Sequence, residues 1–316
     1  MDELNSVALR QQFNRDGYHV MPRYFSAAQV DALCAEVAQS IEEAPMEVVV
    51  DNLRSNQRTF WGNAEERETR YFKFNDLFLL SERTRATVLE AGLARLLANL
   101  IGEPVVLCSS LNFHKGSSQH LHIDSLFMTP LTPHALIATW IALEDAHPDS
   151  GPLIYYPGSH LIPLYRFQDG TNRSTPAEMP AWNDYIAGQV QSRGLKPQTF
   201  LAAKGDVFIW HADLLHGGSP IKDMSRTRQS LVSHYFSESD CRRAECMLVP
   251  LHGNFWMKRL PQPVHMAPEK FSAIAPFPES TYLERHPDVK AAVRIGEFAS
   301  GFEHYRQFGH KEGRGI

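Results

Sequence analysis

Cysteine is scarce in this chain and forms no metal-binding or redox pattern. The four cysteines are Cys34, Cys108, Cys241 and Cys246, and no two of them are spaced as CxxC. Cys241 and Cys246 also lack a histidine neighbour at the spacing of a zinc site. The first residues show neither the basic nor the apolar region of a secretory leader. We therefore expect reduced thiols, no structural zinc and a cytoplasmic location.

Long apolar runs and blocks of like charge are missing as well. No run approaches the roughly 20 apolar residues that cross a bilayer, so we expect no membrane-spanning segment. Lys and Arg total 31 against 36 Asp and Glu, which gives a net charge of −5. Nucleic-acid binding depends on basic surfaces, so neither nucleic acid nor a membrane is expected as a partner. The hydrophobic fraction of 43% indicates a folded protein with a sizeable core.

Most of the predicted regular structure is extended. Short apolar segments between turn residues predict strands at 104–114, 135–145, 151–157, 198–203, 206–211 and 229–237. Two helices are predicted before them: 26–41, which opens with a capping box from Ser26 to Gln29, and 85–101, which ends at Gly102. Many short strands after a helical entry favour a mainly β fold with flanking helices, an antiparallel barrel or jelly roll, over a doubly wound parallel sheet.

The remaining segments are predicted to connect or cover this core. Residues 13–25 read as a turn and a short strand, 45–69 as a mobile loop or partial lid, and 161–198 as a polar insertion over the barrel mouth. We expect one domain over 1–260, then a Pro-rich linker and a small helical tail over 261–316. The tail is expected to dock on the barrel and bury Val289, Val293, Phe302 and Tyr305. A contact with a partner protein is the alternative role.

The chemistry is carried by His122-Ile123-Asp124, by His216 far along the chain, and by Arg228. On an extended strand, side chains at i and i+2 share a face, so His122 and Asp124 would point the same way. A second imidazole would complete a set of two histidines and one carboxylate. That set leaves coordination positions open and suits non-haem Fe(II). A lone HxD tripeptide is weak evidence, and alone it more often has a structural role.

Several blocks in the same order resemble the phytanoyl-CoA dioxygenase-like family of Fe(II)/2-oxoglutarate dioxygenases. The resemblance covers about residues 10 to 240 and rests on blocks starting at Phe13, His122, Ala138, Ser150, Pro157, Gly205, His211 and Thr227. It implies a double-stranded β-helix core, with His122, Asp124 and His216 as the iron ligands. His211 is the competing distal ligand. His216 is preferred because His216-Gly-Gly-Ser219 matches the turn that carries the family's distal histidine.

The resemblance also implies a site for 2-oxoglutarate as cosubstrate. Arg228 matches the arginine that holds its far carboxylate, because a guanidinium fork can meet both oxygens; Arg226 is the rival. Trp140 matches an aromatic residue of the cosubstrate pocket. Ser219, Lys73 and Asn112 are further candidates, although Gly218 stands at the closest match to the family's hydroxyl, and Lys73 and Asn112 could equally be ordinary strand residues.

The implied activity is oxidation of a small organic substrate by molecular oxygen, with 2-oxoglutarate converted to succinate and carbon dioxide. Because Asp124 is present, no position is left for a halide, and hydroxylation is favoured over halogenation, with desaturation or cyclisation still open. Two other classes remain: a cupin-like metal protein with non-oxidative chemistry, and a non-catalytic module that binds 2-oxoglutarate or a glycan. The loops at 45–70 and 161–197 carry no motif that identifies the substrate.

Overall fold

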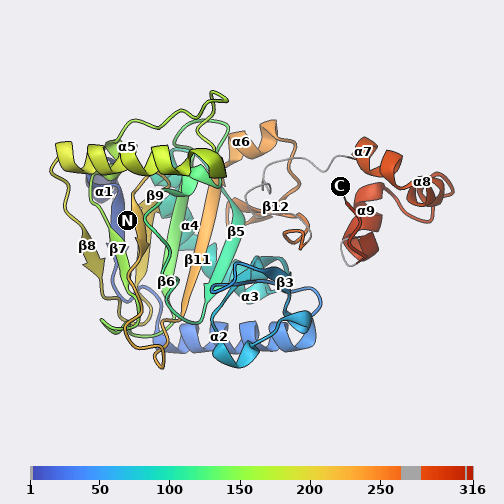
Figure 1. Cartoon of the computed structure of the whole chain (residues 1–316), viewed down its shortest axis with the longest axis horizontal. Helices are drawn as coiled ribbons and strands as arrows, with labels where there is room; N and C mark the ends of the chain where they lie inside the picture. The colour runs from blue at the N-terminus through green and yellow to red at the C-terminus, as the bar shows by residue number, and fades with distance from the viewer. Residues whose placement is uncertain (1–2, 265–278, 310–311, 316) are drawn as a thin grey trace.

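Two β-sheets form the body of the protein (Figure 1). This computed structural model describes residues 3–264, 279–309 and 312–315. The larger sheet has the order β1-β9-β6-β11-β5-β4-β2-β3, with antiparallel neighbours along this path. Its strands are β1 (Tyr18–Met21), β2 (Val49–Asn52), β3 (Arg58–Phe60), β4 (Phe72–Asn75), β5 (Val105–Phe113), β6 (Leu136–Ala142), β9 (Val207–His211) and β11 (Ser230–Ser237).

Three further strands make the smaller sheet, and a hairpin extends the larger one. The smaller sheet runs β10-β7-β8 and consists of β10 (His216–Gly218), β7 (Leu153–Tyr155) and β8 (Gln198–Phe200). The hairpin of β12 (Leu248–Leu251) and β13 (Asn254–Met257) pairs with β5. Apolar side chains of both sheets, among them Trp140, Phe208 and Leu153, pack into one cluster. The expected arrangement of mainly antiparallel strands in two layers is therefore present.

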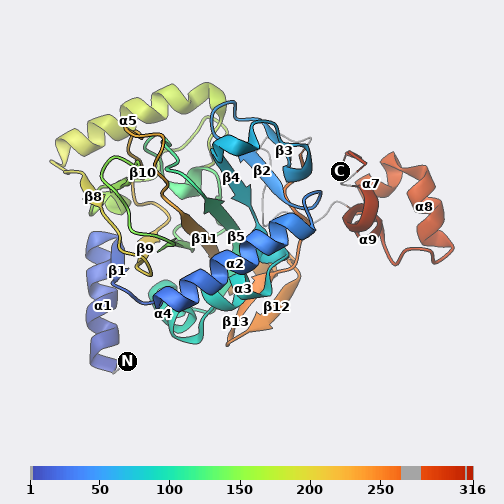
Figure 2. The same ribbon diagram turned by 90° about the horizontal axis from the view of Figure 1, so that it is seen from below.

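Four helices cover the other face of the larger sheet: α1 (Glu3–Asp16), α2 (Ala27–Glu43), α3 (Glu82–Val88) and α4 (Ala91–Ile101). Alternation along β6 explains this placement. Ile137 and Ile141 pack with Leu33 and Leu97 of the helices, whereas Trp140 faces the smaller sheet. Figure 2 shows α2 crossing in front of the sheet when the molecule is seen from below. The opposite face of the larger sheet, which is turned toward the smaller sheet, is not covered by these four helices and can line a site.

A fifth helix lies across the opposite end of the body. α5 (Met179–Ser192) spans the top of Figure 1, and its buried Trp182 and Ile186 pack on Ile123 and Leu215. The insertion expected to be a polar loop therefore contains a helix that covers the region of the predicted ligands. The short α6 (Glu238–Arg243) follows β11.

The C-terminal tail is helical, as expected. It contains α7 (Glu279–Arg285), α8 (Pro287–Arg294) and α9 (Gly301–His304), followed by a π-helical turn at Tyr305–Gly309. The predicted residues Val289, Val293, Phe302 and Tyr305 do pack in a cluster, but with Tyr282, Leu283 and Leu260 rather than against the barrel strands. Pro268, Pro276 and Pro278 of the predicted linker lie outside the described residues. The domain boundary at 260 stays a prediction.

Two local expectations were wrong, and one helix was not predicted. The single helix predicted over 85–101 is two: α3 ends at Val88, and Glu90 caps the start of α4 by accepting hydrogen bonds from the N–H groups of Gly92 and Leu93. The segment expected to be a mobile loop at 45–69 contains the hairpin of β2 and β3, which extends the larger sheet. No pattern in the sequence predicted α1, which precedes β1.

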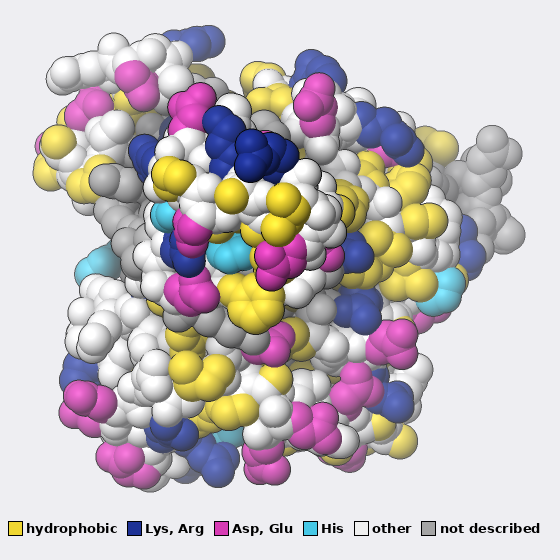
Figure 3. Space-filling view, turned by 90° about the vertical axis from the view of Figure 1, so that its right-hand side faces the viewer, with side chains coloured by type: hydrophobic (Ala, Val, Ile, Leu, Met, Phe, Trp, Pro, Cys, Tyr) yellow, Lys and Arg dark blue, Asp and Glu magenta, His cyan; other side chains and the backbone are white. Residues whose placement is uncertain are grey.

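The described cysteines and surface agree with the absences in the sequence. All four cysteines are free. Among the described helices, none combines the length and apolar character needed to cross a bilayer. Figure 3 shows the face on the side of the tail, where acidic and basic side chains are mixed with apolar ones. This face offers no broad field of one sign.

Candidate active site

Three predicted metal ligands converge between the two sheets. The backbones of His122 and His216 pair in an antiparallel bridge, with N–H to O distances of 2.9 and 3.0 Å. Ile123 is extended, so Asp124 points to the same side as His122. The strand stops there, because Asp124–Leu126 is a 3-10 turn whose first N–H donates to the Ala212 carbonyl. One ligating atom from each of the three side chains lies within 4.8 Å of the others.

The two imidazoles turn their Nε2 atoms toward the carboxylate of Asp124. Nδ1 of His122 lies 2.7 Å from the His120 carbonyl oxygen, and Nδ1 of His216 lies 2.8 Å from that of Leu214. A carbonyl only accepts, so each Nδ1 carries a proton and donates it, and Nε2 is the nitrogen left to bind a cation. These Nε2 atoms lie 3.8 and 3.6 Å from Oδ1 of Asp124. Metal-binding histidines are held in the same way, by their other N–H group.

The charge states at this point favour a cation. Burial, together with the nearby His216, lowers the pKa of His122 to about 4, so its imidazole is neutral at pH 7. Burial acts to raise the pKa of Asp124, but the neighbouring His216, His234 and His122 outweigh it and hold the pKa below its usual range. The neutral imidazole of His122, the imidazole of His216 and one carboxylate thus face a common point. This set of donors fits Fe(II).

Two residues that sequence reasoning missed orient Asp124. Nε1–H of Trp210 donates to Oδ2 at 2.8 Å, and Nε2 of His234 lies 3.4 Å from the same oxygen. Oδ2 is therefore engaged, and Oδ1 is left to face the two histidines. A signal for His234 existed, because even-numbered residues from Ser230 share one face of β11, and Val232 and His234 both line the cavity.

A cavity of about 930 Å³ contains the three ligands and Arg228. Arg228 is 4% exposed, and Nε has no hydrogen-bond partner among the described residues. Its guanidinium lies 5.6 Å from the ring centre of Trp140, which also lines the cavity. Burial lowers the pKa of Arg228 to about 10, so the group stays protonated at neutral pH. Glu144, which accepts hydrogen bonds from Thr227 and Gln229, acts to raise this pKa, but no ion pair to Arg228 is formed within the described residues. A buried guanidinium with a free N–H group makes this end of the cavity a receptor for an anion.

The other predicted cosubstrate contacts are divided. Lys73 lines the cavity, where Nζ lies 2.9 Å from Oδ2 of Asp51. Asn112 lies on the helix-covered face of β5, beside Leu231. Ser219 is not among the lining residues, and its N–H donates to the Pro152 carbonyl. The geometry therefore brings Arg228, Trp140 and Lys73 together but leaves Asn112 and Ser219 outside.

The displacement of Asn112 has a physical cause. Cys108 is an extra residue in β5, because His234 pairs with Ser109 and Tyr235 pairs with Leu107. Such a bulge reverses which alternate residues face inward. Val105 and Leu107 consequently pack against the helices, whereas Leu111 and Phe113 line the cavity. Asn112 is turned away as a result.

The rival residues lie elsewhere. Arg226 is exposed and pairs with Asp223 at 3.1 Å. His211 belongs to a second group with His134 and Asp213. In that group Nδ1 of His134 lies 2.6 Å from Oδ2 of Asp213, and the Ser125 hydroxyl donates to Oδ1. Because Ser125 follows Asp124 in the 3-10 turn, this group helps to hold that turn in place.

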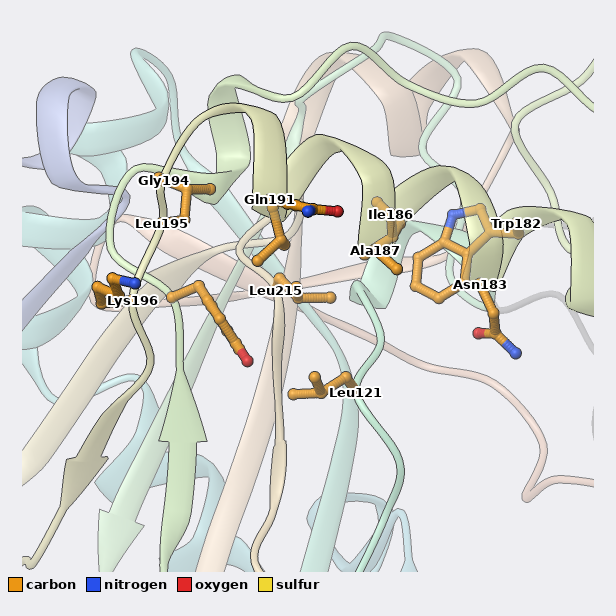
Figure 4. A pocket seen from close by; sticks show the side chains of 12 residues that line it. Leu121, Trp182, Asn183, Ile186, Ala187, Gln191, Gly194, Leu195, Lys196 and Leu215 are labelled. Carbon is orange, nitrogen blue, oxygen red and sulfur yellow. The ribbon is translucent and has the colours of Figure 1, made fainter.

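A second cavity of about 510 Å³ lies beneath α5 (Figure 4). Trp182, Ile186 and Ala187 of the helix face Leu121 and Leu215 across it, and Lys196 stands at one end. Leu121 and Asn183 line both cavities. The helix therefore forms a wall of each.

Comparisons with known proteins agree with this geometry. The family model described as phytanoyl-CoA dioxygenase (PhyH) matches residues 13–228. The peroxisomal phytanoyl-CoA dioxygenase of Rattus norvegicus is 26% identical over 134 residues, 40% of this chain and 36% of the rat protein. That of Bos taurus is 25% identical over 136 residues, with the same coverage. The matched segment thus spans little more than a third of either relative.

Solved structures share the fold at low sequence identity. The epimerase SnoN, crystallised with Fe3+, alpha ketoglutarate and nogalamycin RO, gives a TM-score of 0.55 at 21% identity, covering 75% of this chain and 85% of its own. EctD from S. alaskensis with bound Fe gives 0.54 at 18% identity, covering 76% and 78%. The carbocyclase SnoK gives 0.53 at 20% identity, covering 75% and 84%. The jelly-roll prediction is confirmed, and with the family match over residues 13–228, the chain belongs to the phytanoyl-CoA dioxygenase family.

Proposed function

We propose that this protein is an Fe(II)- and 2-oxoglutarate-dependent oxygenase that hydroxylates a small organic substrate and releases succinate and carbon dioxide. One observation carries the proposal: a buried arginine, whose Nε–H has no hydrogen-bond partner among the described residues, shares a cavity with two histidines and a carboxylate. A metal site alone would serve many chemistries. A metal site together with a receptor for a distant carboxylate suits a chelating keto-diacid.

Each side chain has a distinct task in this proposal. His122, Asp124 and His216 would hold iron, which with 2-oxoglutarate supplies the oxidising chemistry. Arg228 would bind the far carboxylate of 2-oxoglutarate, and Trp140 would fix the guanidinium through its ring face. Trp210 orients Asp124, and apolar Leu111, Val232 and Leu153 keep water from this end of the cavity.

The reaction class is tested by release of succinate from 2-oxoglutarate, with Fe(II) and oxygen supplied. We expect turnover in the wild type that is lost in His216→Ala and kept in His211→Ala, because only His216 lies at the site. Substitution of a residue that only supports a metal ligand typically lowers metal affinity by about 10- to 100-fold. Anaerobic titration with Co(II) should show a larger loss of affinity in His216→Ala. Turnover that survives His216→Ala would refute the ligand assignment.

The product separates hydroxylation from related outcomes. The structural relatives include an epimerase and a carbocyclase, so mass spectrometry of the oxidised substrate is needed. A gain of one oxygen atom supports hydroxylation, whereas loss of two hydrogens points to desaturation or ring closure. Absence of any 2-oxoglutarate turnover would favour the cupin-like or the non-catalytic alternative. The cytoplasmic location and a partner contact through the tail stay predictions.

A further inference from the structure

A second group of side chains that can bind a metal lies outside the active-site cavity. It consists of His134, in the connection that precedes β6, His211, at the end of β9, and Asp213, two residues further along. One nitrogen of each histidine and one carboxylate oxygen lie within 4.8 Å of one another, as the donor atoms of the predicted iron ligands do. None of the three residues lines the cavity that contains Arg228. The group is therefore separate from the proposed active site.

Asp213 presents one oxygen to both histidines of this group. Its Oδ1 accepts a hydrogen bond from the Ser125 hydroxyl. Its Oδ2 lies 2.6 Å from Nδ1 of His134 and 3.6 Å from Nδ1 of His211. Asp124 is arranged in the same way, with one oxygen engaged by a hydrogen-bond donor and the other facing two histidines. Carboxylates that bind metals are typically oriented by such a partner.

The donor atoms are spaced for a small cation. Nδ1 of His211 accepts a hydrogen bond from the N–H group of Asp213 at 3.1 Å, so this nitrogen carries a lone pair. Burial acts to raise the pKa of Asp213, but the hydrogen bond from His134 and the nearby His211 outweigh it and keep the carboxylate ionised. In a tetrahedral zinc site, ligands at about 2.0 to 2.1 Å from the ion lie roughly 3.3 Å from one another. The two distances to Oδ2, 2.6 and 3.6 Å, lie on either side of this value, so small side-chain shifts would admit the ion.

The group is open to solvent on the side of His134. The side chain of His134 is 54% exposed, whereas those of His211 and Asp213 are 18% and 2% exposed. An ion can therefore reach the buried carboxylate from outside and take the place of the proton that His134 shares with it. His134 also has a left-handed backbone, with φ of 71°. This conformation is uncommon outside glycine and is found preferentially at functional sites.

We infer that His134, His211 and Asp213 form a second metal site, and that this site binds Zn(II). Two imidazoles and one carboxylate are common zinc ligands, and water can take the fourth position. The site uses no cysteine, so it differs from the cysteine-based zinc site that the sequence argues against. Through the Ser125 hydroxyl, the bound ion would fix the turn that carries Asp124. The site is independent of the proposed iron centre, because it is built from other side chains.

Zinc ions bound to the full-length protein can be counted by competition with a chromophoric chelator. We expect two equivalents in the wild type and one in His216→Ala, which lacks a predicted iron ligand. His134→Ala should also bind one equivalent, and the double variant none. His147→Ala removes an exposed histidine that has a single carboxylate neighbour, Asp149, and should keep both equivalents. Zinc binding by His216→Ala that is unchanged when His134→Ala is added would overturn the inference.

A second variant separates metal binding from packing. Asp213→Asn keeps the volume of the side chain and removes its charge. Added to His216→Ala, it should lower zinc affinity by more than about 100-fold, beyond the effect of residues that only support a ligand. Zinc affinity that stays within about tenfold would contradict the assignment of Asp213 as a ligand.

Stability gives a further readout, because an ion that binds only the folded state stabilises it. One equivalent of Zn(II) should raise the midpoint of urea unfolding of His216→Ala but not that of His134→Ala/His216→Ala. An equal rise in both proteins would mean that the ion binds elsewhere. If the wild type binds a single ion that is lost in His134→Ala and kept in His216→Ala, the second site is supported and the proposed iron centre fails.

Discussion

The buried guanidinium of Arg228 is the residue whose role can be tested most directly. We expect Arg228→Ala to weaken the binding of 2-oxoglutarate by about 2 to 4 kcal/mol, because a desolvated pair of charges would be broken. Arg226→Ala, which removes an exposed arginine paired with Asp223, is the matched control. Isothermal titration of 2-oxoglutarate into Co(II)-loaded protein measures both. Equal affinity in wild type and Arg228→Ala would move the role to another residue.

At the residue scale, the sequence pointed to side chains that the fold brings together but missed the residues that support them. A short pattern and an ordered set of motifs mark His122, Asp124 and His216, whose side chains lie together in the structure, and their role as metal ligands stays a prediction. Trp210 and His234 were missed because no motif marks a residue that acts on another side chain through tertiary contact. Asn112, offered as a cosubstrate contact or an ordinary strand residue, faces the helices, and the bulge at Cys108 that sets this face cannot be read from the sequence.

The bridge between His122 and His216 is the element on which the site depends. Gly217 lies beside it, and a Cβ at this position would stand 2.9 Å from the Gln119 carbonyl oxygen, a backbone atom with little freedom to move. Gly217→Ala should therefore separate β10 from residues 119–122. We expect a loss of about 1 to 3 kcal/mol in the free energy of unfolding, as in other overpacked sites, together with weaker binding of Co(II).

Gly188→Ala is the control for that substitution. Gly188 lies in α5, and an added Cβ meets nothing within 4 Å. Alanine is favoured over glycine in a helix by about 1 kcal/mol, so this variant should be slightly more stable, with unchanged metal binding. Urea denaturation and metal titration of both variants decide the matter. If Gly217→Ala matches the wild type in both its free energy of unfolding and its affinity for Co(II), the site does not depend on this close approach of β10 to residues 119–122.

At the scale of elements, the sequence predicted the strands of the core but not the segments between them. Periodicity located β5, β6, β9 and β11 within a few residues, because buried strands carry continuous apolar runs. The hairpin at Val49–Asn52 and Arg58–Phe60 was read as a loop because Asp51 and Arg58 look solvated, yet they neutralise one another inside the cavity wall. α5 was hidden in the same way, by polar residues on its outer face.

The stability of the whole molecule should depend on pH through its buried histidines. Burial lowers the pKa of both His122 and His211 to about 4, whereas these groups take up protons near pH 6.5 in the unfolded chain. Between these values the unfolded state binds more protons, so the metal-free protein should lose stability as the pH falls from 6.5 towards 4. Each histidine contributes roughly 3 kcal/mol at most across this window.

His134 should act in the opposite sense. Its hydrogen bond to Asp213 raises its pKa, so its contribution is fully present below pH 6.5 and is lost as the pH rises through the folded value. His134→Gln removes this contribution and should make the loss of stability on acidification steeper. Urea denaturation in the presence of a chelator at pH 7.5 and 5.5 measures both slopes. A wild-type protein equally stable at the two values would contradict the assignment of neutral buried histidines.

The order of the elements has a consequence for how the protein holds together once iron is present. His122 precedes β6 and His216 follows β9, so β6, β7, α5, β8 and β9 all lie between two predicted ligands of a single ion. Coordination would act as a cross-link that closes this long loop, much as a disulfide does in secreted proteins. Iron starvation would then remove more than activity: the apoprotein would open more readily and become the form that cellular proteases cut.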